Sequence, residues 1–433
     1  ILIASRSEMG QGIRTSLASA IAVELEADWQ YVTVKQAIGH EKYGNQNTDG
    51  SRSVRTKLEP MRKMGAAAKM MLITAAAKKW NVAEALCKAE HHFVINKKNN
   101  DKIFFGDLVE EASKVAIPND EAIQLKKVED FKYIGKTLKS VDLKDFTHGT
   151  ANYGIDVRIP NMKFAAIARC PVTFGTVKSY NSASAENIDG VEQIVNIDRM
   201  VPPTGKFFGA LGGVAVIANS TWAAFQGKLD LDIEWDYGTN HSFDTDTFKA
   251  TLTKRLQEKG KLVPGSSGNV TAGFNSAAKT IAATYHVPFL VHAPMEVPNA
   301  TAWFKGDKIE VWAPLQDPQT ARAELAHFFE IPLENITINV TFLGGGFGRK
   351  SKSDFVVEAV AVSKQIKAPV QVVWTREDDV KHSFYHATSA QYLKGGLDDK
   401  GNTTAWLQRV AVPSITSRFK PLSDYASGFE LNQ

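Results

Sequence analysis

A run of glycines between a predicted strand and a predicted helix constrains this chain more than any other feature. Residues 336–342 alternate apolar and polar side chains as a strand does, and residues 353–366 are typical of a helix capped by Ser353 or Asp354. Between them, four of the five positions from Gly344 to Gly348 are glycine. Such a unit points backbone N–H groups at an anion, and bare backbone can approach a ligand closely.

The spacing of this glycine loop fits neither of the common nucleotide loops. A Walker loop requires a glycine directly before Lys-Ser or Lys-Thr, whereas Lys350 here follows Arg349. A dinucleotide fingerprint requires the pattern GxGxxG, whereas these glycines recur at every second residue. A plain tight turn needs one glycine rather than four, and Phe347 is an odd residue for it. The loop therefore predicts backbone held against a bulky ligand.

Composition places the chain among ordinary globular proteins and excludes several classes of partner. Its 433 residues suggest two or three domains, and its net charge of +4 is too small to imply nucleic acid or an anionic membrane. No apolar run approaches the roughly 20 residues of a spanning helix. The two cysteines, Cys87 and Cys170, cannot supply an iron–sulfur cluster or a zinc CxxC pair, and we expect free, buried thiols.

The order of predicted elements indicates an α+β fold with mixed sheets. Helices are predicted over residues 16–28, capped by Thr15 or Ser16, and over residues 57–80. Short strands punctuated by Pro, Gly and Asn then dominate, before strands and helices mix again. We divide the chain into three segments, which are residues 1–130, a separate α+β domain over 131–236, and residues 237–433.

Two polar loops near the N-terminus are candidate binding segments. In Glu8–Gly12, the amide of Gln11 lies between two glycines and could recognise the edge of a heterocycle, although a plain turn explains the pattern too. In residues 47–53, small hydroxyl side chains precede a helix and fit a phosphate pocket, although a plain polar loop is the alternative. The hydroxyl residues are Thr48, Ser51 and Ser53.

Further candidates lie in the C-terminal half. His292, Glu296 and Gln316 follow predicted strands and could line a cavity, while a packed core histidine is the alternative for His292. His382 and His386 have the spacing of metal ligands on a helix, but no third ligand is apparent. The acidic and basic run over 375–382 is interpreted as a solvated charge cluster.

Together these stretches resemble the large, molybdopterin-binding subunit of the xanthine dehydrogenase/aldehyde oxidase family. GGGFGRK resembles that family's glycine loop, EMGQG its pterin-contacting glutamine loop, and NTDGSRS its phosphate loop. Residues 146–180 resemble its α/β-hammerhead domain, which we expect inserted over 131–236. The glutamine loop precedes the hammerhead here, and this permuted order resembles the isoquinoline 1-oxidoreductase β-subunit branch, which also includes membrane-associated bacterial aldehyde dehydrogenases.

The resemblance implies a role for individual residues. The predicted contacts with the pterin, its phosphate and the metal's oxygen ligands come from Met9, Gly10, Gln11, Thr48, Ser51, Ser53, Gln316, Gly345, Gly346, Phe347 and Gly348. Gln316 would donate to the oxo ligand, the Phe347 N–H would face another oxygen, and the pterin sulfurs would hold the molybdenum without a protein ligand. Ser351 replaces the substrate-binding glutamate of xanthine enzymes, which indicates an aldehyde or neutral N-heterocycle.

The same resemblance implies a molybdenum hydroxylase that takes its oxygen from water. Electrons would pass to a small [2Fe–2S] subunit and on to a cytochrome, and the pterin is expected in its cytosine dinucleotide form. The general-base glutamate of the family is expected beyond Gln433, so we expect a chain truncated at both ends and inactive alone. The resemblance favours a periplasmic or membrane-associated location, with the cytoplasm as the alternative.

Two other classes of function stay open at this point. One is a cofactor-free scaffold or binding homologue, which the absent catalytic glutamate would allow. The other is a nucleotide-binding enzyme that uses the glycine loop for ATP or NAD. Intact glutamine, hydroxyl and glycine loops argue against the scaffold, because a protein without cofactor need not keep all three.

Overall fold

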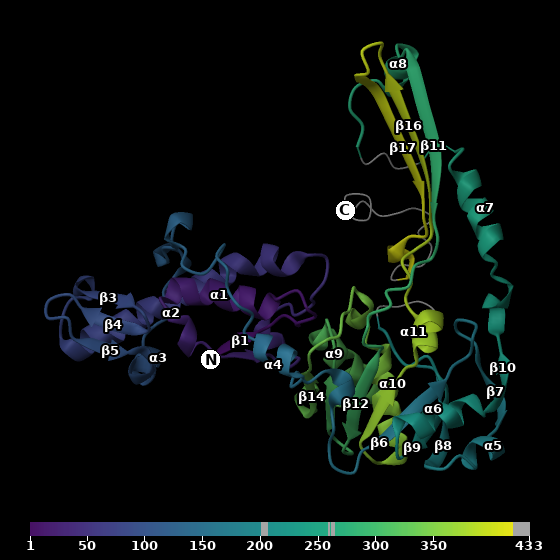
Figure 1. Cartoon of the computed structure of the whole chain (residues 1–433), viewed down its shortest axis with the longest axis horizontal. Helices are drawn as coiled ribbons and strands as arrows, with labels where there is room; N and C mark the ends of the chain where they lie inside the picture. The colour runs from purple at the N-terminus through teal and green to yellow at the C-terminus, as the bar shows by residue number, and fades with distance from the viewer. Residues whose placement is uncertain (201–206, 259, 261–264, 419–433) are drawn as a thin grey trace. The chain divides into compact units, whose positions relative to one another are not determined.

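The computed structural model of the chain describes residues 1–200, 207–258, 260 and 265–418 (Figure 1). The chain forms two compact units, each built from two separate stretches. The first unit contains residues 1–162 and 294–371, and the second contains residues 163–293 and 372–433. The three segments inferred from sequence, and the hammerhead domain among them, stay predictions.

The first unit combines two packed helices, small sheets and a mixed sheet. Its helices are α1 Ile13–Leu25, α2 Arg52–Trp80, α3 Val109–Ser113, α4 Leu143–His148, α9 Pro318–Phe329 and α10 Asp354–Ile366. Its strands are β1 Leu2–Ala4, β2 Val34–Gln36, β3 Cys87–Glu90, β4 Phe93–Asn96, β5 Lys102–Phe104, β12 Asn299–Phe304, β13 Ile309–Ala313 and β14 Ile336–Val340. The strand β15 Val370–Val373 lies across the boundary of the unit.

Helices α1 and α2 pack at very short range, and a glycine makes this possible. A Cβ atom on Gly65 of α2 would lie 2.4 Å from the backbone oxygen of Ile21 and 3.1 Å from the Cβ of Glu24, both on α1. Apolar side chains fill the contact on either side, among them Leu17 and Met61. This pair carries the first two predicted binding loops at its N-terminal ends, so its packing sets where those loops start.

The mixed sheet of the first unit positions the glycine loop. Strand β13 pairs antiparallel with β12 and parallel with β14. The glycine loop leaves the end of β14 and leads into α10, whose apolar side chains are buried. A β strand followed by a glycine loop and a helix is the arrangement that the sequence predicted for these residues.

The second unit contains an antiparallel sheet covered by a helix and a longer three-stranded sheet. Its strands are β6 Lys163–Ala168, β7 Thr176–Asn181, β8 Val191–Ile197, β9 Gly213–Ala218, β10 Asp232–Asp236, β11 Lys279–Val287, β16 Ser389–Leu397 and β17 Thr403–Ala411. Its helices are α5 Ala183–Glu186, α6 Thr221–Leu229, α7 Thr245–Arg255, α8 Val270–Asn275 and α11 Arg376–His382. Strand β9 pairs with β6 and β8, and β16 pairs with β11 and β17.

Two carboxylates of the acidic and basic run over 375–382 are buried, so its interpretation as a solvated cluster was wrong for them, whereas Glu377 and Lys381 are exposed. Asp378 and Asp379 are both buried, and Asp378 Oδ2 lies 2.7 Å from Lys228 Nζ. The Arg169 guanidinium lies 3.6 Å from the same oxygen and 4.0 Å from the centroid of the Trp374 ring. The partners of Asp378 are far away along the chain, since Arg169 directly follows β6 and Lys228 lies in α6, and this is why the sequence suggests a solvated cluster.

Burial within this cluster also sets the state of a histidine. It lowers the pKa of His382 to about 3, and the nearby positive charge of Arg169 acts in the same direction. The imidazole is therefore neutral in the folded protein at ordinary pH. His382 ends α11 while His386 lies beyond the helix, so the two do not form the helical metal pair that their spacing suggests.

The α+β class with mixed sheets is confirmed, while local boundaries differ from the predictions. Helix α1 begins at Ile13 rather than near Ser16, because Gly12 in the left-handed region is its N-cap and Thr15 lies inside it. Helix α2 begins at Arg52, five residues before the predicted start, and it accommodates Pro60. Strands β12 and β16 were not predicted. Within the described residues, no helix has the length and apolar character needed to cross a membrane.

We expect Gly65→Ala to destabilise the protein by about 1–3 kcal/mol, because the added Cβ would press on the backbone of α1. In a solvent-exposed helix, a change from glycine to alanine stabilises the protein by about 1 kcal/mol. The sign of the change in stability therefore shows whether α1 packs against Gly65. Urea unfolding monitored by circular dichroism measures it. Met64→Ala, at an exposed neighbouring position, is the control, and a stabilised Gly65→Ala protein would contradict the α1–α2 contact.

We expect His382 to make the protein sensitive to acid. The pKa of His382 is lower in the folded protein than in the unfolded chain. Between pH 6.5 and 3 the unfolded chain therefore binds a proton that the folded protein does not. The contribution of His382 to stability is complete above pH 6.5 and is lost as the pH falls toward 3. Relative to His382→Asn, the wild type should lose about 1–2 kcal/mol between pH 6.5 and 4.5. Urea titrations at each pH test this, with the exposed His148→Asn as control; a constant difference would refute it.

Candidate functional site

Close approach, more than turn geometry, explains two of the glycines in the loop. A Cβ atom on Gly344 would lie 2.5 Å from the Cβ of Glu296. A Cβ atom on Gly346 would lie 2.4 Å from Gln316 Oε1 and 3.0 Å from Met9 Sδ. No side chain fits at either position without displacing these neighbours. The structure therefore brings together predicted residues from the glutamine loop, the glycine loop and Gln316.

The side chain of Gln316 joins the glycine loop to the predicted phosphate loop. Its Nε2 donates to the backbone oxygen of Thr48 over 2.7 Å, and its Oε1 accepts from Gly348 N over 3.0 Å. The backbone adds two bonds, from Thr48 N to Gln316 O and from Gln316 N to Lys350 O, each 2.9 Å long. Nε2 carries a second N–H, which meets no acceptor within the described residues.

Three consecutive backbone donors in the glycine loop also lack acceptors. Gly344 N donates to Glu296 and Gly348 N donates to Gln316, so the two ends of the loop are tied down. Between them, the N–H groups of Gly345, Gly346 and Phe347 meet no acceptor within the described part of the chain. An anionic or oxygen-rich ligand would satisfy them in place of solvent, because successive backbone N–H groups in a turn form a concavity that binds anions.

Phe347 is held in an unfavourable conformation beside these donors. Its φ is +54°, in the left-handed region that aromatic residues rarely occupy, and 68% of its surface is exposed. Its ring lies over Gly345, where an added Cβ would be 3.1 Å from Phe347 Cε2. Strained backbone of this kind costs of order 1–3 kcal/mol and gathers at ligand-binding sites.

The glutamine loop is shaped by a carboxylate that the sequence analysis did not single out. Buried Glu8 accepts from Gly10 N and Gly12 N through Oε1, over 3.0 and 2.9 Å, and from Arg14 N through Oε2 over 3.1 Å. It thereby caps the N-terminus of α1. Gln11 is exposed, and its amide is folded onto its own loop, accepting from Met9 N over 2.7 Å. A glutamate directly before a glycine turn that opens a helix is the feature that indicates such a cap.

The three hydroxyl residues of the predicted phosphate loop have different surroundings. Thr48 is buried, and its hydroxyl accepts from Ser7 N over 3.0 Å. Ser51 is exposed, has a φ of +52° and is the N-cap of α2 without a side-chain capping bond, and Ser53 lies in the first turn. Arg52 N donates to Asp49 O over 3.1 Å, and the N-terminus of this 29-residue helix is a place where an anion is favoured.

Two cations lie beside the segment that leads into this loop. Arg6 Nη1 donates to Asn45 Oδ1 over 3.3 Å, and Arg6 Nε is buried without an acceptor within the described residues. Burial lowers the pKa of Arg6, against the opposing charges of Asp49 and Asp317, and burial together with the charge of Arg6 lowers the pKa of Lys57. A bound anion would relieve both effects, because it favours the charged forms of these groups.

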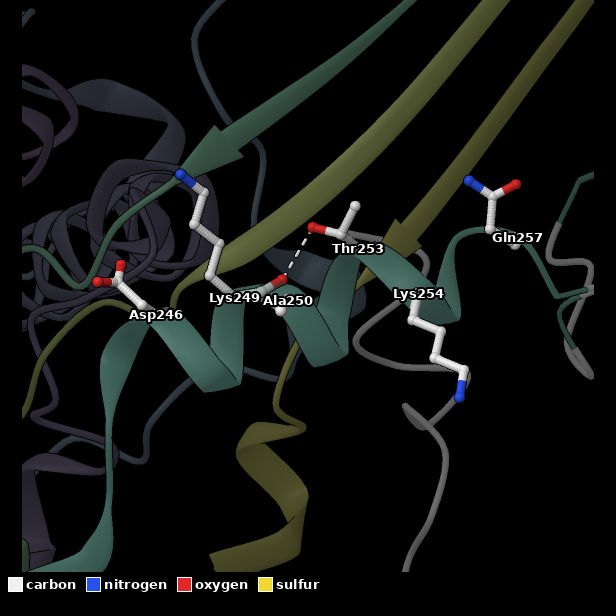
Figure 2. Close-up of a pocket in the computed structure, with 6 residues that line it drawn as sticks. All are labelled: Asp246, Lys249, Ala250, Thr253, Lys254 and Gln257. Carbon is white, nitrogen blue, oxygen red and sulfur yellow. Dashed lines mark hydrogen bonds between the residues drawn. The ribbon is translucent and has the colours of Figure 1, made fainter.

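Other places with potential for chemistry do not gather the predicted residues. A surface pocket along α7 is lined by Asp246, Lys249, Ala250, Thr253, Lys254 and Gln257 (Figure 2). Figure 2 shows the side chains of Lys249 and Lys254 extending in different directions, and all lining residues come from α7 or directly follow it. Within the described residues, no three His, Cys, Asp or Glu side chains lie together in a way that could hold a metal ion.

Comparison with known proteins identifies the class of this site. Two family models, each described as a molybdopterin cofactor-binding domain, match residues 1–159 and 255–412. The first contains the glutamine and phosphate loops, and the second contains Gln316 and the glycine loop. The residues fit such a cofactor, since free N–H groups, glycines too crowded for a side chain and an open helix N-terminus come from these two segments. This is a molybdopterin-binding protein.

Three curated relatives narrow the class. Membrane-bound aldehyde dehydrogenase (pyrroloquinoline-quinone) of Gluconacetobacter polyoxogenes is 29% identical over 92% of this chain and 52% of its own length. The beta subunit of isoquinoline 1-oxidoreductase from Brevundimonas diminuta is 25% identical over 96% of this chain and 58% of its own. The B subunit of nicotinate dehydrogenase from Pseudomonas putida is 26% identical over 94% of this chain and 34% of its own.

The chain belongs to the large subunits of the xanthine dehydrogenase/aldehyde oxidase family, as the sequence resemblance implied. It spans about half the length of the first two relatives and about a third of the third. The roles of the individual site residues stay predictions, supported by the geometry described above.

We expect Gly346→Ala to reduce retention of the molybdenum cofactor at least about tenfold, since the new Cβ would displace Gln316 and Met9. Molybdenum content after gel filtration, measured beside the circular dichroism spectrum, separates loss of binding from loss of folding. Gly395→Ala, where a Cβ would make ordinary contacts of 3.5 Å, is the matched control. Full cofactor content in Gly346→Ala would show that the glycine loop does not carry the site.

Proposed function

We propose that this chain is the cofactor-binding part of a molybdenum hydroxylase catalytic subunit. The enzyme would oxidise an aldehyde or an N-heterocycle with oxygen derived from water, and would pass electrons to an iron–sulfur partner. The observation that carries the proposal is the row of unpaired N–H groups at Gly345, Gly346 and Phe347, beside the free donor of Gln316. The names of the relatives, which include an aldehyde dehydrogenase and two N-heterocycle oxidoreductases, support it.

The residues of this chain would bind and orient the cofactor. The three loop N–H groups and Gln316 Nε2 would donate to its acceptor atoms, while Met9 and the Phe347 ring would pack against its apolar surface. When bound, the molybdenum–pterin group supplies hydroxylation and the uptake of two electrons. The donors are preorganised, since Glu296 and Gln316 already hold both ends of the loop.

The phosphate groups of the cofactor would lie at the N-terminus of α2. Ser51 and Ser53 offer hydroxyl groups there, and the first-turn N–H groups add further donors. Thr48 would act by shaping the loop, because its hydroxyl already accepts from Ser7 N. The cations of Arg6 and Lys57 nearby favour more than one phosphate, which supports the cytosine dinucleotide form.

The substrate would be neutral. Ser351 stands where xanthine enzymes carry a carboxylate, and its hydroxyl donates to Gly348 O over 2.7 Å. This position therefore presents neither a charge nor a free hydroxyl proton to a substrate, which favours an aldehyde or a neutral N-heterocycle over a purine. We place the [2Fe–2S] cluster on a separate chain, because Cys87 and Cys170 are both free and buried. The general-base glutamate would also lie outside this sequence.

We expect native purification to yield molybdenum equimolar with this chain, and iron on a co-purifying, cysteine-rich subunit. Elemental analysis measures both metals, and mass spectrometry of the released small molecules identifies the pterin and its nucleotide. Protein without molybdenum, from cells able to make the cofactor, would contradict the proposal and favour a scaffold. The proposal would also be wrong if the bound molecule were ATP, NAD or pyrroloquinoline quinone, which the name of one relative contains, in place of the pterin.

A further inference from the structure

We propose that Glu296 is the positioning residue that holds the glycine loop in its binding shape. Its carboxylate would hold the loop by accepting hydrogen bonds from four donors, and this role would matter more than its ion pair with Lys350. The inference rests on the proposed function only for the identity of the ligand. The feature that Glu296 positions, the row of N–H groups from Gly345 to Phe347, is a property of the chain itself.

The carboxylate of Glu296 receives donors from three separate parts of the first unit. Oε2 accepts from Gly344 N over 2.9 Å and from Lys350 Nζ over 2.7 Å. Oε1 accepts from Ile155 N and from Asn299 Nδ2, each over 3.2 Å. Glu296 is 9% exposed and Lys350 is fully buried, so these bonds form away from solvent.

The donors to Oε2 enclose the functional part of the loop. Gly344 directly precedes the three unpaired N–H groups, and Lys350 follows them after one paired glycine and Arg349. The backbone of Glu296 also donates to Gly344 O over 2.9 Å, so the loop entrance is held from both directions. Lys350 O in turn accepts from Gln316 N. Glu296 thus fixes the entrance of the loop through Gly344, and the bond from Lys350 adds a contact beyond the exit, where Gln316 holds Gly348.

The chemistry of the site requires a carboxylate of this length. An ionised carboxylate accepts at two oxygens and donates at neither, which matches the four donors that its oxygens meet among the described residues. An amide at the same position would place an NH2 group against two donors. The side chain also lies directly against the loop, since a Cβ on Gly344 would be 2.5 Å from the Glu296 Cβ. This contact accounts for the first glycine of the loop.

This assignment separates Glu296 from the general base that the family uses. A base must release a hydrogen bond to take up a proton from the reacting group. The Glu296 carboxylate is buried, and its two oxygens already accept from four donors, one of them the buried ammonium of Lys350. Glu296 therefore acts through the loop and is a positioning residue.

The test compares single and double substitutions. Glu296→Gln alone also removes the negative charge next to the buried Lys350 ammonium, so a loss of stability and the loss of the acceptor would occur together. The variant Glu296→Gln/Lys350→Met removes the charge problem and leaves only the loss of acceptor capacity. The matched control is Glu24→Gln/Arg62→Met. Glu24 is a buried glutamate of the same unit that accepts from Arg62 Nε over 2.8 Å and from Lys126 N over 3.1 Å.

Two readouts are measured on the native holoenzyme and on cofactor-free protein. The Glu296→Gln/Lys350→Met variant should keep a melting temperature close to that of the Glu24→Gln/Arg62→Met control, yet retain at least tenfold less molybdenum after gel filtration. In cofactor-free protein, amide hydrogen exchange at the paired N–H groups of Gly344, Gly348 and Arg349 should be at least tenfold faster than in wild type, with the rest of the first unit unchanged. A residue with only a general structural role would accelerate exchange throughout the unit.

The outcomes separate the two proposals. Wild type without molybdenum would contradict the proposed function, while the exchange experiment would still test the role of Glu296. The inference would be overturned by the following result in a preparation whose wild type contains molybdenum. The Glu296→Gln/Lys350→Met variant would retain the metal and would protect the N–H groups of Gly344, Gly348 and Arg349 from exchange as well as the control does. Recovery of both readouts in a Lys350→Met variant that keeps Glu296 would support it, since the backbone donors would then still have their acceptor.

Discussion

The buried amide of Gln316 is the contact on which the arrangement of the site depends. It joins Thr48, 268 residues away along the chain, to Gly348, 32 residues away. Only a side chain that both donates and accepts can satisfy the Thr48 carbonyl and the Gly348 N–H at once. Leaving either group buried and unpaired would cost about 1–3 kcal/mol, so the identity of this residue and the approach of the two loops depend on each other.

Two buried glutamates decide which backbone donors remain available for a ligand. Glu8 takes the N–H groups of Gly10 and Gly12, and Glu296 takes the N–H group of Gly344. The donors left over form one continuous row in the glycine loop. A loop in which every N–H was free would be flexible, and a loop in which every N–H was paired could bind nothing. Selective pairing gives a rigid loop with a defined set of donors.

Local pattern predicted the elements around the site well, because each depends on neighbours a few residues away. The strand, glycine loop and helix over 336–366 are where the alternation and the turn residues indicated. The start of α1 was placed too late, since hydroxyl side chains suggested a cap at Thr15 while the N-cap is Gly12, and Glu8 from the preceding turn accepts from the N–H groups of Gly12 and Arg14. Strand β12 was missed because its first residue, Asn299, follows a stretch rich in proline.

Long-range electrostatics was the weakest part of the prediction, for a physical reason. A charged side chain in sequence is assigned to solvent unless its partner is nearby, yet Asp378 pairs with Lys228 at a separation of 150 residues. Glu296 was considered only as a possible lining residue of a cavity, and the lysine that pairs with it lies 54 residues away. The amide of Gln11 bonds within its own loop, and its predicted contact with the pterin stays a prediction.

The sequence by itself determined the family, the α+β class and the three loops from which the site is built. These follow from local sequence patterns, which do not depend on where the segments lie in the folded protein. Tertiary structure decided which groups in those loops remain free. That outcome depends on where Gln316, Glu8 and Glu296 end up in space, since each buried donor must find an acceptor and these side chains supply it. Short stretches of sequence therefore determine which chemical groups the site contains, while contacts between distant residues determine its shape.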